Sequence, residues 1–357
     1  MALAAPPDEQ AVSTPFFEIK LNGNDLPPEA RGEVTRLVVE ECLDAAGSFE
    51  MQLSNWDMDR QAVSWSDADL FDPGASVEIR LGYVESTETV LTGEVTGLEL
   101  SFPDGARSLV TVRGYDRLHR FRRGKRTRSY LQVKDSEIAS KLAADLGLTA
   151  DVEDSGAVHE HLVQVNQSDL DFLFSRARAS GFELLVDDKT LHFRKLRHDR
   201  GTALTLDFTH GLMMFDGYLS TSDQVGQVTV HGTDPATLEP IVGLAQAGDV
   251  AATMGGSSSG PAASARLFGE RTLSIVDQPV VTQAEADQLA LSIMQELALG
   301  YISGEATAQG NPAIRVGTVV ELAGLGRRFS GNYYVTRVRH VWDGQFLTRF
   351  GVRRNAS

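Results

Sequence analysis

The sequence is poor in cysteine, in long apolar runs and in net positive charge, and each shortage excludes a class of protein. Cys42 is the single cysteine among 357 residues, which excludes an intrachain disulfide. Its place in the apolar run LVVEECL favours a buried structural thiol. No stretch reaches the roughly 18 consecutive apolar residues of a membrane-spanning helix. We therefore expect assembly in a reducing cytoplasm, with no membrane partner.

The start of the chain, MALAAPPDEQ, has neither the basic nor the apolar region of a secretory signal. We expect residues 1–13 to form a disordered arm. Hydrophobic residues make up 42% of the sequence, and its length suggests two or three globular domains.

Positive charge is scarce overall but concentrated in one segment. The formal net charge is −16, yet residues 117–128, RLHRFRRGKRTR, hold seven Arg or Lys and no acid, so the rest of the chain carries −23. An acidic body works against binding a polyanion, so we expect the segment to meet an acidic surface on a neighbouring subunit rather than nucleic acid. A second Arg-rich stretch, from Arg327 to Arg354, could act in the same way. The candidate subunit-interface residues are Arg117, Arg120, Arg122, Arg123, Lys125, Arg126 and Arg128.

Short alternating apolar segments separated by turn signals predict an antiparallel β unit over residues 14–128. TRLVVEECLDAAGSFEMQLS reads as two strands that turn near Asp44–Gly47, and SVEIRLGY, ETVLTGEVTGLEL and SLVTVRGYD follow. A lone sheet would leave one apolar face in water, so the pattern indicates a small barrel or sandwich.

The apolar period changes to that of helices after the basic segment. DSEIASKLAADLGL predicts one helix, and a second helix starts at Ser168, with Asp171 at capping-box spacing and Gly181 at its end. Thr282 and Glu285 predict a third helix start. The predicted parts are an α+β insertion (129–200), the start of a second barrel (201–242), a flexible Ala/Gly/Ser-rich loop (243–270), a helical insertion (271–312) and the completion of the second barrel (313–357).

An internal repeat is suggested by the order of short signals. GASVEI at 74–79 resembles GTVVEL at 317–322, and a Ser/Thr-Gly pair and an alternating strand follow each. VTVHGTD, at 228–234, would then belong to the first hairpin of the second copy. We interpret the pattern as a duplication rather than as two unrelated β domains. Three such chains would make a ring of six similar units.

Several segments together resemble a known family. They are VLTGEVTGLEL, VTVRGYDRLHRFRRGKRTRSYL, DSEIASKLAADLGL, VQVNQSDLDFLFSRARASGFELLVDDKTLHFRK and PAIRVGTVVELAGLGRRFSGNYYVTRVRHVW. In order and content they resemble the late control D family of phage tail proteins and the N-terminal hub part of VgrG spike proteins. The resemblance covers nearly the whole chain from about residue 14, and 110–195 is its most specific part.

The resemblance implies a mainly β fold with α+β insertions, in which two tube-protein-like antiparallel β-barrels per chain form a pseudo-six-fold ring as a trimer. It implies a structural baseplate hub that matches a three-fold spike to the six-fold inner tube. The expected partners are further copies of the chain, a separate trimeric spike protein, the inner tube protein and other baseplate components. Phage tails and phage-like injection systems both fit, and the cargo is open.

The sequence predicts no catalytic residue, no cofactor and no metal site. Asp57, Asp59, Asp67 and Asp69 could serve a tail-tip cell-wall hydrolase, but the loop WDMDRQAVSWSDADLF favours solvated charge. The two histidines of VHEHL, at 159 and 161, are expected at a solvated strand edge. A DNA-binding regulator that acts through residues 117–128 is the other alternative.

Overall fold

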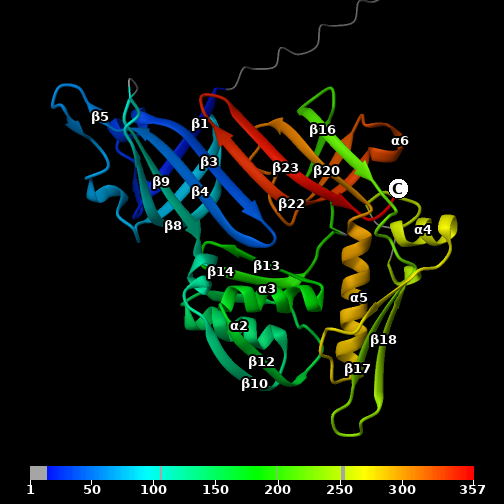
Figure 1. Cartoon of the computed structure of the whole chain (residues 1–357). Coiled ribbons are helices and arrows are strands. Elements are labelled where there is room, and N and C mark those ends of the chain that lie inside the picture. Colours follow the sequence, from blue (N-terminus) through cyan, green and yellow to red (C-terminus); the bar gives the residue numbers. More distant parts are fainter. Residues whose placement is uncertain (1–13, 105–106, 199, 251–253) are drawn as a thin grey trace, which may run out of the picture.

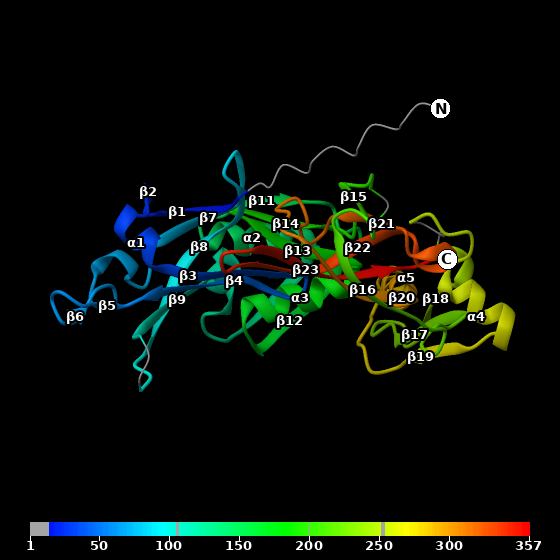
Figure 2. The same cartoon turned by 90° about the horizontal axis from the view of Figure 1, so that it is seen from above.

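The computed structural model describes residues 14–104, 107–198, 200–250 and 254–357, so the predicted arm at 1–13 lies outside the described residues. The fold is mainly β, as predicted. One sheet of 13 strands, the main sheet, runs along the molecule, and two α+β parts lie below it in the view of Figure 1. Figure 2 shows the same sheet from above. Within these residues no helix has the length and apolarity needed to cross a membrane.

Six strands from the N-terminal third of the chain make up the first unit of the main sheet. They are β1 (Pro15–Leu21), β3 (Val34–Cys42), β4 (Ala45–Ser54), β7 (Ser76–Tyr83), β8 (Ser86–Ser101) and β9 (Leu109–Asp116). The first unit has the strand order β1-β7-β8-β9-β4-β3, and all its neighbouring strands are antiparallel. Its connections hold β2 (Asn24–Asp25), α1 (Pro28–Glu33), β5 (Trp56–Asp57), β6 (Ala62–Val63) and η1 (Asp69–Phe71).

The C-terminal part of the chain makes a second unit with the same strand order. Its elements are β15 (Leu204–Asp207), β16 (Leu212–Leu219), β20 (Ile302–Gln309), β21 (Val319–Ala323), α6 (Gly326–Phe329), β22 (Gly331–Trp342) and β23 (Phe346–Arg354). The order is β15-β21-β22-β23-β20-β16, so the six strands of either unit, numbered along the chain, read 1-4-5-6-3-2. The two units differ in the direction of their first strand, since β1 is antiparallel to β7 whereas β15 is parallel to β21. The shared order supports the internal repeat.

A β-bulge marks the same place in both units. The β8–β9 ladder passes over Thr96, and the β22–β23 ladder passes over Thr336. The Thr96 hydroxyl donates to the carbonyl of Arg113 at 3.5 Å, and the Thr336 hydroxyl to that of Gly351 at 3.2 Å. Since a bulge adds one residue to one strand only, it aligns the repeat on Thr96 and Thr336. The Ser/Thr-Gly pairs had suggested an alignment shifted by two residues.

The two units are joined edge to edge by β22 and β3. Residues 331–334 of β22 pair with β21, and residues 337–342 pair in antiparallel fashion with residues 37–42 of β3. Among the described strands, no ladder joins β3 to β1. The closed barrels predicted from the sequence are therefore not found. Each unit is an open, curled sheet. In the first unit, β22 occupies the edge of β3 that would close the barrel.

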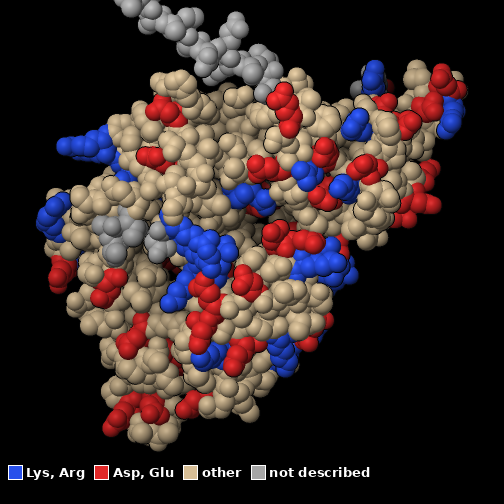
Figure 3. Space-filling model, turned by 180° about the vertical axis from the view of Figure 1, so that it is seen from behind, with Lys and Arg blue, Asp and Glu red and all other residues tan. Residues whose placement is uncertain are grey.

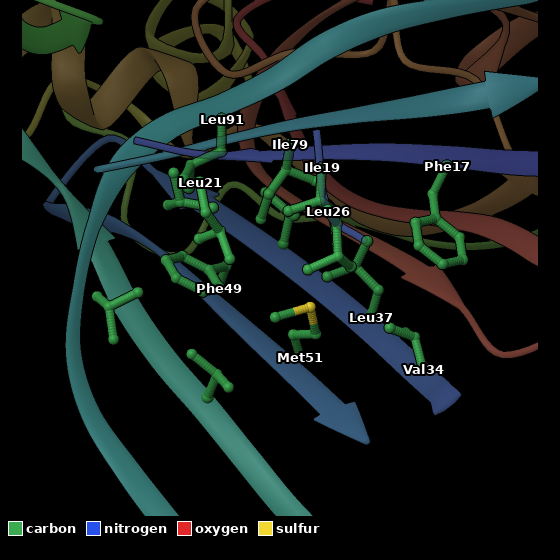
Figure 4. Close-up of a cluster of buried hydrophobic side chains, with 14 of the residues drawn as sticks. Phe17, Ile19, Leu21, Leu26, Val34, Leu37, Phe49, Met51, Ile79 and Leu91 are labelled. Carbon is green, nitrogen blue, oxygen red and sulfur yellow. The ribbon is translucent and has the colours of Figure 1, made fainter. Parts of the chain in front are cut away.

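Each unit curls around an apolar core of its own. Phe17 of β1 and Leu37 of β3 share the first core although their strands lie at opposite edges of the unit. Figure 4 shows side chains of β1 and β7 meeting those of β3 and β4 across this core. The second core contains Tyr333 and Phe350. Trp342 of the second unit lies edge-on to Phe17, with 4.5 Å between the ring centroids, so the second unit also covers one end of the first core.

Residues 117–195 form the first insertion, between the two units. Its elements are η2 (Arg117–Arg122), β10 (Arg126–Val133), α2 (Asp135–Asp145), β11 (Thr149–Val152), β12 (His159–Gln167), α3 (Asp169–Ser180), β13 (Phe182–Asp187) and β14 (Thr190–Lys195). Its core runs from Leu118 to Phe193. The predicted caps of α3 are confirmed: the Ser168 side chain accepts from the Asp171 amide, and Gly181 is left-handed with φ +70°.

A second insertion separates β16 from β20. It contains β17 (Gln227–Thr233), β18 (Pro240–Gln246), η3 (Ala247–Asp249), α4 (Gly260–Phe268), β19 (Thr272–Ile275) and α5 (Gln283–Leu299). Its three strands form a separate sheet under α5, with their own core. The capping box of Thr282 and Glu285 at the start of α5 is confirmed.

Three sequence predictions for this region are wrong. VTVHGTD, as β17, lies in the second insertion, and the first hairpin of the second unit is instead split between β16 and β20. Residues 260–268, predicted as loop, form α4, because Ser259 caps an alanine-rich turn. β20 belongs to the main sheet although it falls in the predicted helical insertion. Within the predicted loop 243–270, residues 251–253 lie outside the described residues.

Candidate subunit interface

The predicted basic segment lies where the first unit meets the first insertion. Asp116 caps η2 by accepting from the Leu118 amide. The side chains of Leu118 and Phe121 are buried in the core of the first insertion. The pKa of Asp116 is raised to about 7, chiefly by burial, while hydrogen bonds from the amides of Gly47 and Leu118 oppose the shift. The segment is thus fixed at both its start and its middle.

Arg117 and Arg120 form ion pairs within the chain. Arg117 is buried and pairs with Asp188, whereas Arg120 pairs with Glu94 of β8. His119 also contacts Glu94, at 2.8 Å. The hydrogen bond from Arg120 lowers the pKa of Glu94 to about 2, with a further contribution from His119. These cations hold η2 to the main sheet and to the turn between β13 and β14.

Arg126 and Arg128 both reach Asp169, the first residue of α3. Arg128 lies 2.7 Å from that carboxylate and Arg126 lies 3.6 Å from it. Asp169 is buried and also accepts from the side chain of Gln164 at 2.8 Å. A carboxylate in the first turn is favoured by the helix dipole, so these two cations fasten the start of α3 to β10.

Arg122, Arg123 and Lys125 are exposed, and none of them forms an ion pair within the described part of the chain. The interface of seven cations stays a prediction, and these three are its members without an ion pair in the described residues. The second Arg-rich stretch is also partly paired, for example Arg337 with Glu305. On the face shown in Figure 3, Lys and Arg lie interspersed with Asp and Glu rather than in one large field.

The aspartates considered for hydrolysis lie on the surface around β5 and β6. Asp59, Asp67 and Asp69 are exposed. Asp57 accepts from the amides of Asp59 and Arg60, at 2.9 and 3.0 Å, which is a local turn. The solvated-loop prediction is confirmed, and no buried carboxylate pair is formed here.

His159 differs from its prediction, because it is buried rather than solvated. Its ring contacts Glu285 at the start of α5, Asp135 at 3.2 Å and Arg176 at 3.0 Å. Burial lowers its pKa, but the hydrogen bonds to Asp135 and Glu285 outweigh that effect and raise it to about 9. In the described residues, no group of His, Cys, Asp and Glu is arranged to hold a metal ion.

A cavity of about 580 Å³ lies between α3, α5 and the second unit. Its buried carboxylate, Glu183, accepts from the Tyr334 hydroxyl and from Arg194 at 2.7 Å. Burial, and then the negative charge of Glu183, raise the pKa of Tyr334 well above its usual value. The Tyr334 hydroxyl and the Glu183 carboxylate are hydrogen-bonded to each other, which favours a structural over an acid–base role.

Two edges of the main sheet carry exposed apolar side chains that sequence reasoning missed. Beyond Val95, β8 pairs only with β9, and Leu98, Leu100 and Phe102 are 38%, 48% and 59% exposed. At the other end of the sheet, β16 pairs only with β20, and Tyr218 is 66% exposed. The missed signal was the alternation LELSF, which extends β8 far past the end of β7.

The model of the family described as Alg8 N-terminal domain matches residues 11–343. This chain belongs to the Alg8 N-terminal domain family. No curated protein matches this member of the family.

Solved structures share the fold of this Alg8 N-terminal domain. The 43 kDa tail protein of prophage MuSo2 from Shewanella oneidensis is 16% identical, with a TM-score of 0.72 over 96% of this chain and 98% of that one. The tail protein of Neisseria meningitidis MC58 is 12% identical, with a TM-score of 0.68 over 96% and 97%.

A third similar structure comes from a secretion system. The c3393 protein of E. coli is described as a component of the type VI secretion system that resembles the T4 tail proteins gp27 and gp5. It is 13% identical, with a TM-score of 0.61 over 95% of this chain and 77% of that one. The predicted likeness in fold to tail and secretion proteins is confirmed.

Proposed function

We propose that this chain is a structural hub in the baseplate of a contractile phage tail or phage-like injection system. Three copies form a ring that presents six similar units. One face of the ring docks a three-fold spike and the other starts the six-fold inner tube. This is the role implied by the resemblance to the late control D family and the VgrG hub part.

The observation that carries the proposal is the strand order shared by the two units. Both units follow the order 1-4-5-6-3-2, and both have a bulge at corresponding threonines, Thr96 and Thr336. They lie side by side in one sheet through the pairing of β22 with β3. Two alike units per chain allow three chains to offer near six-fold contacts, which is what a spike-to-tube adaptor requires.

The site chemistry supports an assembly role over the alternatives. Four of the seven cations in the basic segment are used within the chain, which weakens the case for a nucleic-acid patch. The surface aspartates are solvated and the cavity carboxylate is paired. The proposed partners are further copies, the spike, the tube protein and other baseplate components, with assembly in the cytoplasm before incorporation into the particle.

The mass of the purified chain in solution, measured by light scattering, tests the proposal. We expect a trimer, and a ring with six lobes in electron micrographs of the same sample. The tube and spike proteins of the same system, each added separately, should bind to opposite faces. A monomer at every concentration that also binds neither protein would contradict the hub.

A further inference from the structure

The internal repeat shows how one copy of this chain would pair with the next. We propose, on the basis of the proposed function, that the free end of β8 pairs in antiparallel fashion with β16 of a neighbouring copy, as β22 pairs with β3 inside the chain. The main sheet would then continue from copy to copy.

The first argument is that each strand of the proposed pair is the counterpart of a strand already paired. β8 and β22 are both the fifth strand of their units, and β3 and β16 are both the second. Inside the chain, the part of β22 after its bulge pairs with β3. The part of β8 after its bulge, residues 97–101, has β9 on one side and, in the described residues, no strand on the other.

The second argument is that β16 is the terminal strand of the main sheet. Residues 212–219 pair with β20 along one edge only. The first unit lies at one end of the sheet in Figure 1 and β16 at the other, so the two free edges belong to opposite ends. Two different patches that complement each other give head-to-tail association, which closes into a ring when the rotation allows. Unpaired edges are templates for added strands.

The ladders of the two units fix the register of the proposed pairing. Val341 pairs with Val38 and Trp342 with Leu37. Through the bulge alignment and the ladders of β4 and β20, these pairs transfer to Ser101 opposite Asp216 and Phe102 opposite Phe215. The proposed register across the two chains is Leu98↔Leu219, Glu99↔Tyr218, Leu100↔Gly217, Ser101↔Asp216 and Phe102↔Phe215.

The side chains agree with this register. Leu98 and Leu100 lie opposite Val112 and Val110 of β9 and share their core-facing side of the sheet, yet they are partly exposed because no described residue covers them fully. Phe102 would lie over the second core of the neighbouring copy, as Trp342 lies over the first core within the chain. On the outer side, Glu99 would meet Tyr218, where the chain itself has the pair Arg339–Glu40 at 3.0 Å.

Cysteine cross-linking tests the register. In the double variant Ser101→Cys, Asp216→Cys, mild oxidation should join chains covalently, with a closed trimer as the limiting product on a non-reducing gel. Each single variant retains Cys42 and should remain uncross-linked. Because directly opposed residues of antiparallel strands lie within disulfide distance, Val38→Cys with Val341→Cys should give an intrachain bond and serves as the positive control.

The matched negative control is Ser101→Cys with Glu305→Cys, since Glu305 lies opposite Asp216 but one strand deeper. Leu100→Lys should in addition shift the mass towards monomer, whereas Leu131→Lys, at another exposed strand leucine, should not. A wild-type trimer whose double variant does not cross-link would overturn this pairing and leave the hub intact. Cross-linked ladders that extend beyond three chains would support the pairing but contradict the three-fold hub. A wild-type monomer without cross-links would contradict both.

Discussion

The two units of the main sheet share a strand order but fill their cores in different ways. In the first unit, Phe49 on the third strand lies over Gly114 on the sixth, where an added Cβ would come within 2.3 Å of the ring. In the second unit, the position that corresponds to Phe49 is Gly304, and Phe215 on the second strand fills the space above it. The close pair of a ring and a glycine thus lies on the third and sixth strands of the first unit but on the second and third strands of the second unit, where Val352 stands in the place of Gly114.

This difference teaches that the strand order does not depend on keeping particular core residues. A core needs a total volume and a pattern, and several distributions of side chains satisfy both. The polar bulge, by contrast, is the same in both units, because its hydrogen bond depends on backbone geometry. The repeat is therefore clearer in turns and bulges than in the core.

The largest expected effect is the difference in stability loss between alanine substitutions at Gly114 and at Gly304. Gly114→Ala should lower the free energy of unfolding by about 3 kcal/mol or more, because its Cβ would also meet the Glu94 carbonyl at 2.1 Å. Gly304→Ala should cost less, since its nearest neighbour is the Phe215 ring at 2.6 Å. Gly97→Ala has open space and is the neutral control. Urea unfolding measures all three.

Double variants sharpen that prediction. Phe215→Leu should relieve much of the cost of Gly304→Ala, because the clash there is with a side chain. Phe49→Leu should leave the cost of Gly114→Ala largely in place, because the carbonyl of β8 does not move with it. Equal relief in the two units would show that their glycine–ring contacts do not differ as described.

A smaller effect is expected where the insertions meet through buried charge rather than through a ladder. Because the folded pKa of His159 is about 9 and the unfolded value about 6.5, the native state holds a proton that the unfolded chain releases between these values. The free energy of unfolding should therefore fall, by roughly 2 kcal/mol, as pH rises from about 6.5 to about 9. His159→Gln should abolish this slope. An identical slope in the variant would rule out His159 as its source.

The smallest effect is expected at equivalent surface ion pairs. Glu50 and Glu305 occupy corresponding positions, but Glu50 pairs with Arg113 on the sixth strand and Glu305 with Arg337 on the fifth. The side chains are roughly half exposed, so Glu50→Gln and Glu305→Gln should each change stability by less than about 1 kcal/mol. The change should vanish in high salt. A loss well above this in one unit alone would reveal an electrostatic difference between the units.

Much of the local structure could be predicted because its signals are local. Ser168 and Thr282 cap their helices as the spacing predicts, and the turn between β3 and β4, at residues 43–44, overlaps the predicted turn near Asp44–Gly47. The loop assignment of 260–268 overlooked a cap of the same kind at Ser259, followed by three alanines.

Other features could not be predicted because they depend on distant partners. The burial of His159 depends on Glu285, which lies 126 residues further along the chain. The pairing of four basic residues within the chain depends on Glu94, Asp169 and Asp188. The joining of the two units depends on which strand meets the outer edge of β3, and no short segment specifies this.

The extra residue at Thr336 allows the continuous strand β22 to pair with β21 before the bulge and with β3 after it, with the alternation of its side chains shifted by one residue. Before it, β22 matches β21, and after it the offset brings Trp342 to the side of the sheet where Phe17 lies. Without that offset, every later side chain would turn to the opposite side. The continuation of the main sheet from the second unit into the first therefore depends on one extra residue in β22. Thr96 gives β8 the same offset just before its unpaired end.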